Sequence, residues 1–107
     1  MTMAELYSAL SSLGMAVAYG EFTQPTELPF LTYQFVNDND KKADNQNYAE
    51  ISNFRIELYT AKKDPDKETL VQNKLKELRL PYSKLEAYIS SENMRQVIYE
   101  IQLVGAQ

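Results

Sequence analysis

A stretch in the middle of the chain decides the fold: FRIELYT at residues 54–60, followed after three residues by Asp64 and Pro65. Apolar side chains occupy every second position at the start of this stretch, which is the period of a strand with one buried face. Asp64 offers an N-cap acceptor, and Pro65 suits the first helical position, where its missing N–H does no harm. The pattern therefore predicts a long strand over 48–60 that is followed by a helix over 65–79.

The same two patterns recur on both sides of this stretch. Thr2 and Glu5 stand three apart before an apolar helical repeat, which indicates a capping box and a helix over 3–13. Further strands are predicted over 30–36, 85–90 and 94–103, with a short strand or extended segment over 15–19 and a loop over 20–29. Strands separated by single helices are typical of an α+β layer. We expect one domain over 1–107, with two helices packed on one face of a mainly antiparallel sheet of about four to five strands.

The segment 37–47 is almost entirely polar and is predicted to be a loop at the tip of a hairpin. Its acidic residues raise the possibility of a calcium loop of the EF-hand type. Counted from Asp38, however, Lys42, Ala43 and Ala49 occupy positions that should carry a ligand, a glycine and a glutamate. A solvated tip is the better interpretation, and we take its charged residues as a candidate interaction loop: Asp38, Asp40, Lys41, Lys42 and Asp44.

The composition excludes several classes of chemistry. The 107 residues include no His, no Cys and no Trp. A Ser-His-Asp triad, a thiol nucleophile and metal sites built on His or Cys are therefore excluded. No glycine-rich phosphate loop is present, because the three glycines are isolated. We expect no cofactor and no enzymatic activity.

The charges and the hydropathy bear on the partners. Eleven Lys and Arg against fifteen Asp and Glu give a net charge of -4, which argues against nonspecific nucleic-acid binding. Residues 61–80 differ from the rest, with six basic and four acidic side chains, so a mildly basic helix could steer self-association or bind a partner. A solvated helix face is the better interpretation of these charges. No apolar run reaches the length of a membrane span, and the N-terminus lacks the basic start of a secretory signal.

Two groups of residues remain as functional candidates. Glu57 and Glu100 could form a pair of carboxylates on neighbouring strands, although solvated positions on the polar face of a sheet explain them as well. The eight tyrosines favour an interaction protein, because Tyr is enriched at protein–protein interfaces. Any single Tyr is nonetheless more readily explained as a core or sheet residue.

Several stretches together resemble small proteins from the structural gene modules of long-tailed phages and prophages of Gram-positive bacteria. The stretches are LYSAL at 6–10, VAYG at 17–20, FRIELYT at 54–60, KKDP at 62–65, YISSENM at 88–94 and VIYEI at 97–101. Such proteins are described as minor capsid, head–tail joining or tail-completion proteins. Their layout is similar to that of tail terminators, which form a ring, often of six subunits, at the end of the tail tube.

The resemblance implies an assembly component that acts in the virion and in the host cytoplasm during assembly. It implies self-association in a ring and contact with tail-tube or head-connector proteins, with the 37–47 loop ordered against a neighbour. No membrane and no sequence-specific nucleic acid is implied as a partner. Two alternatives stay open from the residues: an adaptor for another intracellular protein, and a small enzyme domain that uses carboxylates or Tyr.

Overall fold

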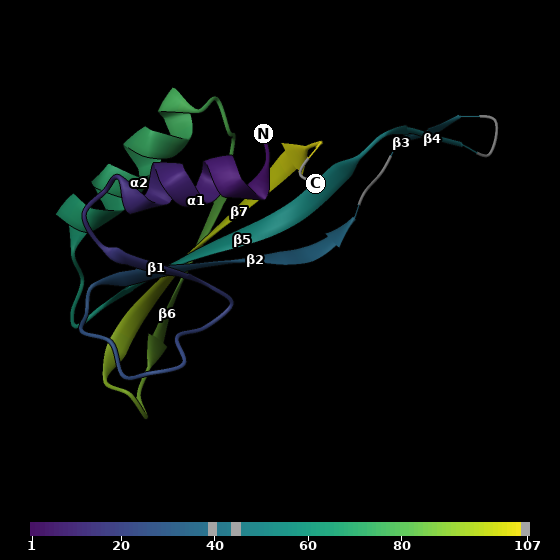
Figure 1. Ribbon diagram of the computed structural model, residues 1–107. Coiled ribbons are helices and arrows are strands. Elements are labelled where there is room, and N and C mark those ends of the chain that lie inside the picture. Colours follow the sequence, from purple (N-terminus) through teal and green to yellow (C-terminus); the bar gives the residue numbers. More distant parts are fainter. Residues whose placement is uncertain (39–40, 44–45, 106–107) are drawn as a thin grey trace.

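The computed structural model describes residues 1–38, 41–43 and 46–105, with the backbone alone for 41–43 and 46–49. In these ranges the chain forms two helices and seven strands (Figure 1). The helices are α1 (Met3–Ser11) and α2 (Pro65–Glu77). The strands are β1 (Ala16–Tyr19), β2 (Phe30–Asp38), β3 (Lys41–Ala43), β4 (Gln46–Ala49), β5 (Ile51–Thr60), β6 (Ser83–Ile89) and β7 (Met94–Val104).

Five of the strands form one sheet in the order β1-β2-β5-β7-β6. β1 and β2 run parallel, and the other neighbours are antiparallel. Both helices lie on the same face of this sheet (Figure 1). The predicted α+β fold, with two helices on one face of a mainly antiparallel sheet, is therefore confirmed.

Local sequence signals fix both helices as expected. The Glu5 N–H donates to Thr2 Oγ1 at 3.1 Å, and the Thr2 N–H donates to Glu5 Oε1 at 2.9 Å, which completes the predicted capping box. The Lys67 N–H donates to Asp64 Oδ1 at 3.2 Å and caps α2. α2 ends in a left-handed turn at Arg79, with a φ of 59°, and the Leu80 N–H returns to the Leu75 carbonyl oxygen.

The core lies between the helices and the face of the sheet that they cover. Its buried side chains are Leu6, Leu10, Met15, Leu31, Tyr33, Phe54, Ile56, Leu58, Val71, Leu75, Val97, Tyr99, Ile101 and Leu103. Leu58 on β5 stands opposite both Leu31 and Val97 in the register of the neighbouring strands. The alternation that predicted the strands thus also predicts the side chains that bury against the helices.

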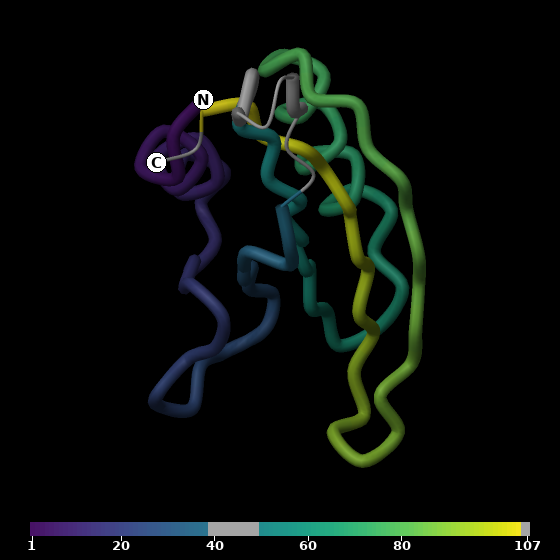
Figure 2. The backbone as a smooth tube through the Cα atoms, turned by 90° about the vertical axis from the view of Figure 1, so that its right-hand side faces the viewer, coloured from purple at the N-terminus to yellow at the C-terminus, as the bar shows by residue number. Residues whose placement is uncertain are grey.

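The N-terminus lies beside the end of β7 (Figure 2). The N-terminal ammonium of Met1 donates to the Val104 carbonyl oxygen at 3.0 Å. This contact joins the start of α1 to the end of β7, the longest strand of the sheet.

The prediction of a loop over 37–47 is wrong in part. β2 continues to Asp38, and β3 and β4 pair antiparallel as a separate two-stranded sheet, here called the arm (residues 41–43 and 46–49). A ladder of backbone hydrogen bonds needs no apolar side chains, so a polar sequence can form it. In the described ranges no helix is long and apolar enough to cross a membrane.

Candidate interaction surfaces

The arm projects from one end of the body, and its strands pair only with each other (Figure 1). Polar side chains form its base. Ser52 Oγ donates to Asp38 Oδ1 at 2.9 Å, and Gln102 Nε2 donates to Asn53 Oδ1 at 3.0 Å. A bulge between Phe35 and Asn37 bends β2 where it leaves the body. The paired backbones of β3 and β4 thus form a ribbon that is separate from the five-stranded sheet.

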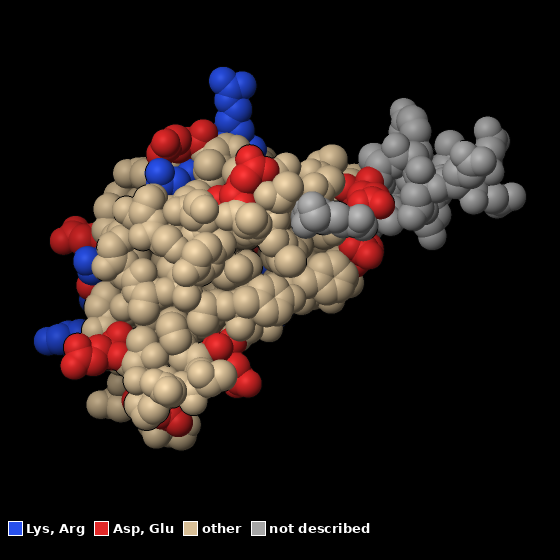
Figure 3. Space-filling view, in the orientation of Figure 1, with Lys and Arg blue, Asp and Glu red and all other residues tan. Residues whose placement is uncertain are grey.

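Three of the five predicted interaction residues, Asp38, Lys41 and Lys42, fall on the described part of the arm and its base. Asp38 lies at the end of β2 and is exposed, and acidic side chains flank the base of the arm in Figure 3. Lys41 and Lys42 lie in β3, where their backbones are paired with those of Ala49 and Asn47, respectively. Asp40 and Asp44 lie outside the described residues.

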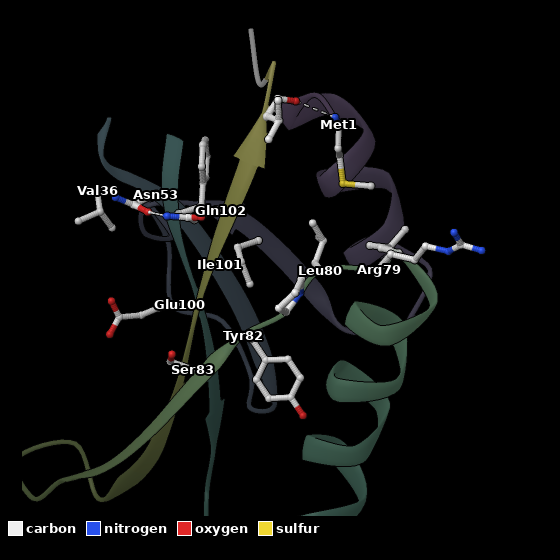
Figure 4. Close-up of a pocket in the computed structure, with 14 residues that line it drawn as sticks. Met1, Val36, Asn53, Arg79, Leu80, Tyr82, Ser83, Glu100, Ile101 and Gln102 are labelled. Carbon is white, nitrogen blue, oxygen red and sulfur yellow. Dashed lines mark hydrogen bonds between the residues drawn. The ribbon is translucent and has the colours of Figure 1, made fainter. Parts of the chain in front are cut away.

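A groove of about 720 Å³ opens beside the base of the arm (Figure 4). Leu80, Tyr82 and Ile101 line it, with Met1 above them and Arg79 at the side. β6 begins at Ser83, opposite Glu100, whereas β7 continues to Val104. Within the described chain, the last residues of β7 therefore have no strand beside them on this side. An open strand edge with apolar walls is suited to an added extended segment.

The sheet also has two outer strands that differ in character. Near β1, Tyr7 and Tyr19 are 45% and 51% exposed, and the Phe35 N–H donates to the Tyr19 hydroxyl at 3.1 Å. Near β6, exposed Leu85 and Tyr88 lie beside charged side chains. Tyrosines are thus exposed at both edges, whereas Tyr33 and Tyr99 lie in the core.

The charge near the two outer strands differs as well. Residues 1–30, which form α1 and β1, contain three Glu and no Lys or Arg, whereas residues 61–80 around α2 are net basic. α2 is joined to the β6 edge through Glu68, whose carboxylate contacts Lys84 Nζ at 2.7 Å and Lys63 Nζ at 2.8 Å. The N-terminal part of the chain is therefore acidic and aromatic, whereas the segment around α2 is net basic through Lys62, Lys63 and Arg79, which flank a helix with no net charge.

The two carboxylates of the paired-carboxylate hypothesis lie on the same face of the sheet, but one is exposed and the other is buried. Glu57 and Glu100 lie on the neighbouring strands β5 and β7, on the face away from the helices. Glu100 is exposed, as expected, but the expectation of a solvated Glu57 is wrong, because its side chain is buried with 6% of the residue exposed. Three donors hold the Glu57 carboxylate: Gln34 Nε2 at 2.8 Å, the Tyr59 hydroxyl at 2.6 Å and Gln96 Nε2.

The polar cluster around Glu57 was missed in the sequence. Burial and the hydrogen bond to Glu57 together raise the pKa of Tyr59 to about 12. Tyr59 therefore stays protonated at neutral pH and keeps donating to Glu57. The arrangement saturates the carboxylate with donors, which is typical of a structural network. In the described part of the chain, no group of three His, Cys, Asp or Glu side chains is placed to hold a metal ion.

Comparison with known proteins identifies a shared fold. No protein-family model matches the sequence, and no curated protein matches it. Among solved structures, the chain is similar to one from the virion of a native gene transfer agent particle, with a TM-score of 0.64 and 12% sequence identity. The likeness covers 92% of this chain and 90% of that chain. The two proteins therefore share the fold over almost their whole lengths.

Proposed function

We propose that this protein is a non-enzymatic structural component of a phage or phage-like virion, which acts in head–tail joining or tail completion as a subunit of an oligomeric ring. The observation that carries the proposal is the fold likeness to a chain of a gene transfer agent virion, which extends over nearly all of both chains. The family resemblance of the stretches around VAYG and FRIELYT points in the same direction. Fold alone does not fix a function, so the surfaces must supply the rest of the argument.

The two unlike edges of the sheet support a ring. When two different surfaces of a subunit bind each other, the contact repeats from one copy to the next. The copies form a closed ring if the rotation between neighbouring subunits permits it. The acidic residues of segment 1–30, with the tyrosines near α1 and β1, complement the net basic segment 61–80, although α2 itself carries equal numbers of basic and acidic side chains. Contact of one edge with the opposite edge of a second copy would cover the exposed tyrosines on both sides.

The arm and the neighbouring groove support contacts beyond the ring. The described strands of the arm, β3 and β4, form a sheet separate from that of the body, which supports contact of this segment with a tail-tube or head-connector protein. In the described part of the chain, the candidate carboxylate Glu57 is saturated by three donors, which supports a role without catalysis.

Size-exclusion chromatography with light scattering tests the ring, with the protein alone and with the tail-tube protein encoded beside it. The expected result is a ring-sized species or a stable complex with the tube protein. The ring should dissociate more readily in high salt, because screening reduces the attraction between the oppositely charged edges of neighbouring copies. A protein that stays monomeric in both conditions, and is absent from purified particles, would overturn the proposal.

A variant without the arm tests the role of the arm independently of ring formation. Asp38 and Ser52 are register partners, so replacement of 39–51 by Asn-Gly closes a two-residue hairpin. We expect this variant to fold and to keep the edge-to-edge contact, but to lose the complex with the tube or connector protein. A second variant replaces Lys41 and Lys42 by Gln, which keeps the ladder and removes charge from two candidate interaction residues, so a weakened complex would show that their charge contributes to the contact. An unchanged complex with the shortened variant would exclude the arm as the contact.

A further inference from the structure

The outer edge of β6 is open along its whole length. β6 is the last strand of the five-stranded sheet, and within the described residues no strand lies on its far side. Its side chains from Ser83 to Tyr88 are all exposed, and Leu85 among them has 55% of its surface exposed. A long, exposed edge strand is a template for pairing with another chain. This edge therefore offers a place for a further strand.

The register of the sheet determines which backbone groups of β6 point outward. The Gly105 N–H donates to the Glu50 carbonyl oxygen at 3.0 Å, so Gly105 faces β5. Backbone groups alternate along an antiparallel strand, and the even-numbered residues of β7 therefore face β6. Leu85 is paired with Ile98, so it faces β7. The N–H and C=O groups that point away from the sheet are consequently those of Lys84, Glu86 and Tyr88.

The outer edge of β1 offers matching groups at the opposite end of the sheet. The Gly20 N–H donates to the Tyr33 carbonyl oxygen at 2.8 Å, so Gly20 faces β2. Because the groups alternate along the strand, Val17 and Tyr19 face outward. The Tyr19 carbonyl oxygen accepts from the Glu21 N–H at 2.8 Å. The N–H and C=O of Val17 and the N–H of Tyr19 therefore point to the side on which the described chain places no strand.

The directions of the strands allow these two edges to pair with each other in different copies. β1 runs parallel to β2, and each later neighbour in the sheet is antiparallel, so β1 and β6 run in opposite directions. A rotation about an axis along the strands, which places copies side by side in a ring, keeps these directions. β6 of one copy therefore meets β1 of the next copy as an antiparallel neighbour.

The side chains beside the two edges fit one another in size. Val17 lies beside a core residue of β2, so Ala16 and Ala18 lie on the face away from the helices. Lys84 contacts α2, so the next residue, Leu85, lies on the face away from the helices as well. Small alanine side chains on one strand leave space for an exposed leucine on a paired strand. Pairing of the edges would therefore cover Leu85.

The charges beside the two edges are opposite in sign. Beside β6, three cations contact two carboxylates, which leaves one positive charge in excess within this group. The cations are Lys63, Lys84 and Arg95, and the carboxylates are those of Glu68 and Glu86. Residues 1–30, which include β1, contain three Glu and no Lys or Arg, and exposed Glu21 follows β1 directly. The charge of the β1 side thus favours the β6 edge of a second copy as its neighbour.

We propose that β6 of one copy pairs with β1 of a second copy, so that the five-stranded sheets join into one continuous sheet around the ring. The inference rests on the proposed function and names the joint between its subunits. Val17 pairs with Glu86 of the second copy, because this register centres the short β1 on the longer β6. Each of these two residues donates its N–H to the C=O of the other, and the Tyr19 N–H donates to the C=O of Lys84. Ala18 then stands opposite Leu85.

Disulfide trapping tests the joint, because the chain contains no Cys of its own. In the proposed register Ala18 and Leu85 form a non-hydrogen-bonded pair, whose Cα atoms lie about 4.5 Å apart and within reach of a disulfide. Ala18→Cys and Leu85→Cys are prepared as separate full-length proteins and mixed under mild oxidation, alone and with the tail-tube protein. We expect a disulfide-linked heterodimer in the mixture and only background linkage in either protein by itself.

A matched control measures linkage by random collision. Glu77→Cys places the thiol on a side chain that is 68% exposed at the end of α2, away from the proposed joint. Mixed with Ala18→Cys, it should give only the background. Thermal melts followed by circular dichroism establish that each protein is folded.

A backbone variant tests the hydrogen bonds of the joint. Glu86→Pro removes an N–H that points outward, so the ladder with β7 keeps its bonds and β6 should stay in the sheet. In the joint the proline removes one hydrogen bond, and its ring fills the space of the incoming strand. We expect the rate of linkage between Ala18→Cys and Leu85→Cys to fall by about 10-fold when Glu86→Pro is added to the second protein. Glu86→Ala loses the same ion pairs but keeps the N–H, so it should slow linkage by no more than about 3-fold.

Light scattering on the same samples separates the joint from the ring. A ring-sized species in which Ala18→Cys and Leu85→Cys do not link would overturn this inference and leave the proposed function intact. If Leu85→Cys links to itself as readily as to Ala18→Cys, β6 pairs with its own copy across a two-fold axis, which also overturns the inference. Absence of both the ring and the linkage, in folded proteins, would overturn the inference and the proposed function together.

Discussion

The two faces of the sheet bury their side chains in different ways, and neighbouring residues of β5 display the contrast. Leu58 faces the helices and is fully buried among apolar side chains. Glu57 faces away from the helices and is almost as deeply buried, among three hydrogen-bond donors. Burial on the covered face thus comes from apolar packing between layers, and burial on the other face comes from a satisfied polar cluster. The two faces should therefore respond differently to substitution.

The largest effect is expected on the covered face. Leu58→Ala removes a fully buried side chain that stands between Leu31 and Val97, and leaves a cavity that the rigid sheet cannot close. The substitution should lower the free energy of unfolding by about 2–5 kcal/mol. Chemical denaturation followed by circular dichroism measures this change. Leu85→Ala is the matched control, because Leu85 is 55% exposed and its loss should change stability by less than about 0.5 kcal/mol.

The contrast between the faces explains what the sequence could predict. Alternating apolar residues along 54–58 and 97–103 predict the strands and the side chains that face the helices. The same period places Thr32 and Glu57 on the opposite face, where polar residues are ordinarily solvated. Their burial depends on Gln34, Gln96 and the 20–29 loop, which come together only when distant parts of the chain fold on one another.

The surfaces beside the arm were predictable to different degrees. A run of polar residues located the projecting segment correctly, but its strands β3 and β4 depend on backbone pairing, which side-chain hydrophobicity does not report. The groove depends on the register of β6 and β7, because it exists only where β6 begins at Ser83 and β7 continues to Val104. The turn at 90–93 sets the register of this hairpin locally, but the groove also needs Met1, Val36 and Leu80, which reach it only when distant parts of the chain fold together.

An intermediate effect is expected on the polar face. Glu57→Ala leaves the Gln34 amide, the Gln96 amide and the Tyr59 hydroxyl without their shared acceptor. Donors left unpaired in a buried site should lower the free energy of unfolding by about 1–3 kcal/mol. Urea denaturation measures the loss, and Glu100→Ala on the neighbouring strand, where the carboxylate is exposed, is the control. If both substitutions cost the same small amount, the polar cluster does not stabilise this face.

The smallest effect should appear where charge is buried on the covered side. Glu68 on α2 has 4% of its surface exposed, and it contacts Lys63 and Lys84, whose side chains are 47% and 37% exposed. Burial raises the pKa of Glu68, but the hydrogen bonds from the two lysines outweigh burial and lower the pKa below 4.5. Because the lysines are partly solvated, Glu68→Gln should cost only about 1 kcal/mol at pH 7.

The pH dependence of this loss distinguishes a charged contact from a packing defect. The pKa of the Glu68 carboxyl group is lower in the folded state, so the unfolded state binds its proton more readily. The contribution of Glu68 to the free energy of unfolding is therefore complete above the unfolded pKa of 4.5, and it is lost as the pH falls through the folded pKa. The difference in unfolding free energy between the wild type and Glu68→Gln should therefore shrink below pH 4.5. Urea titrations at a series of pH values measure it, with Glu77→Gln, exposed on the same helix, as the control. A difference that persists unchanged in acid would mean that Glu68 stabilises the helix by its shape, and the covered face would then depend on packing alone.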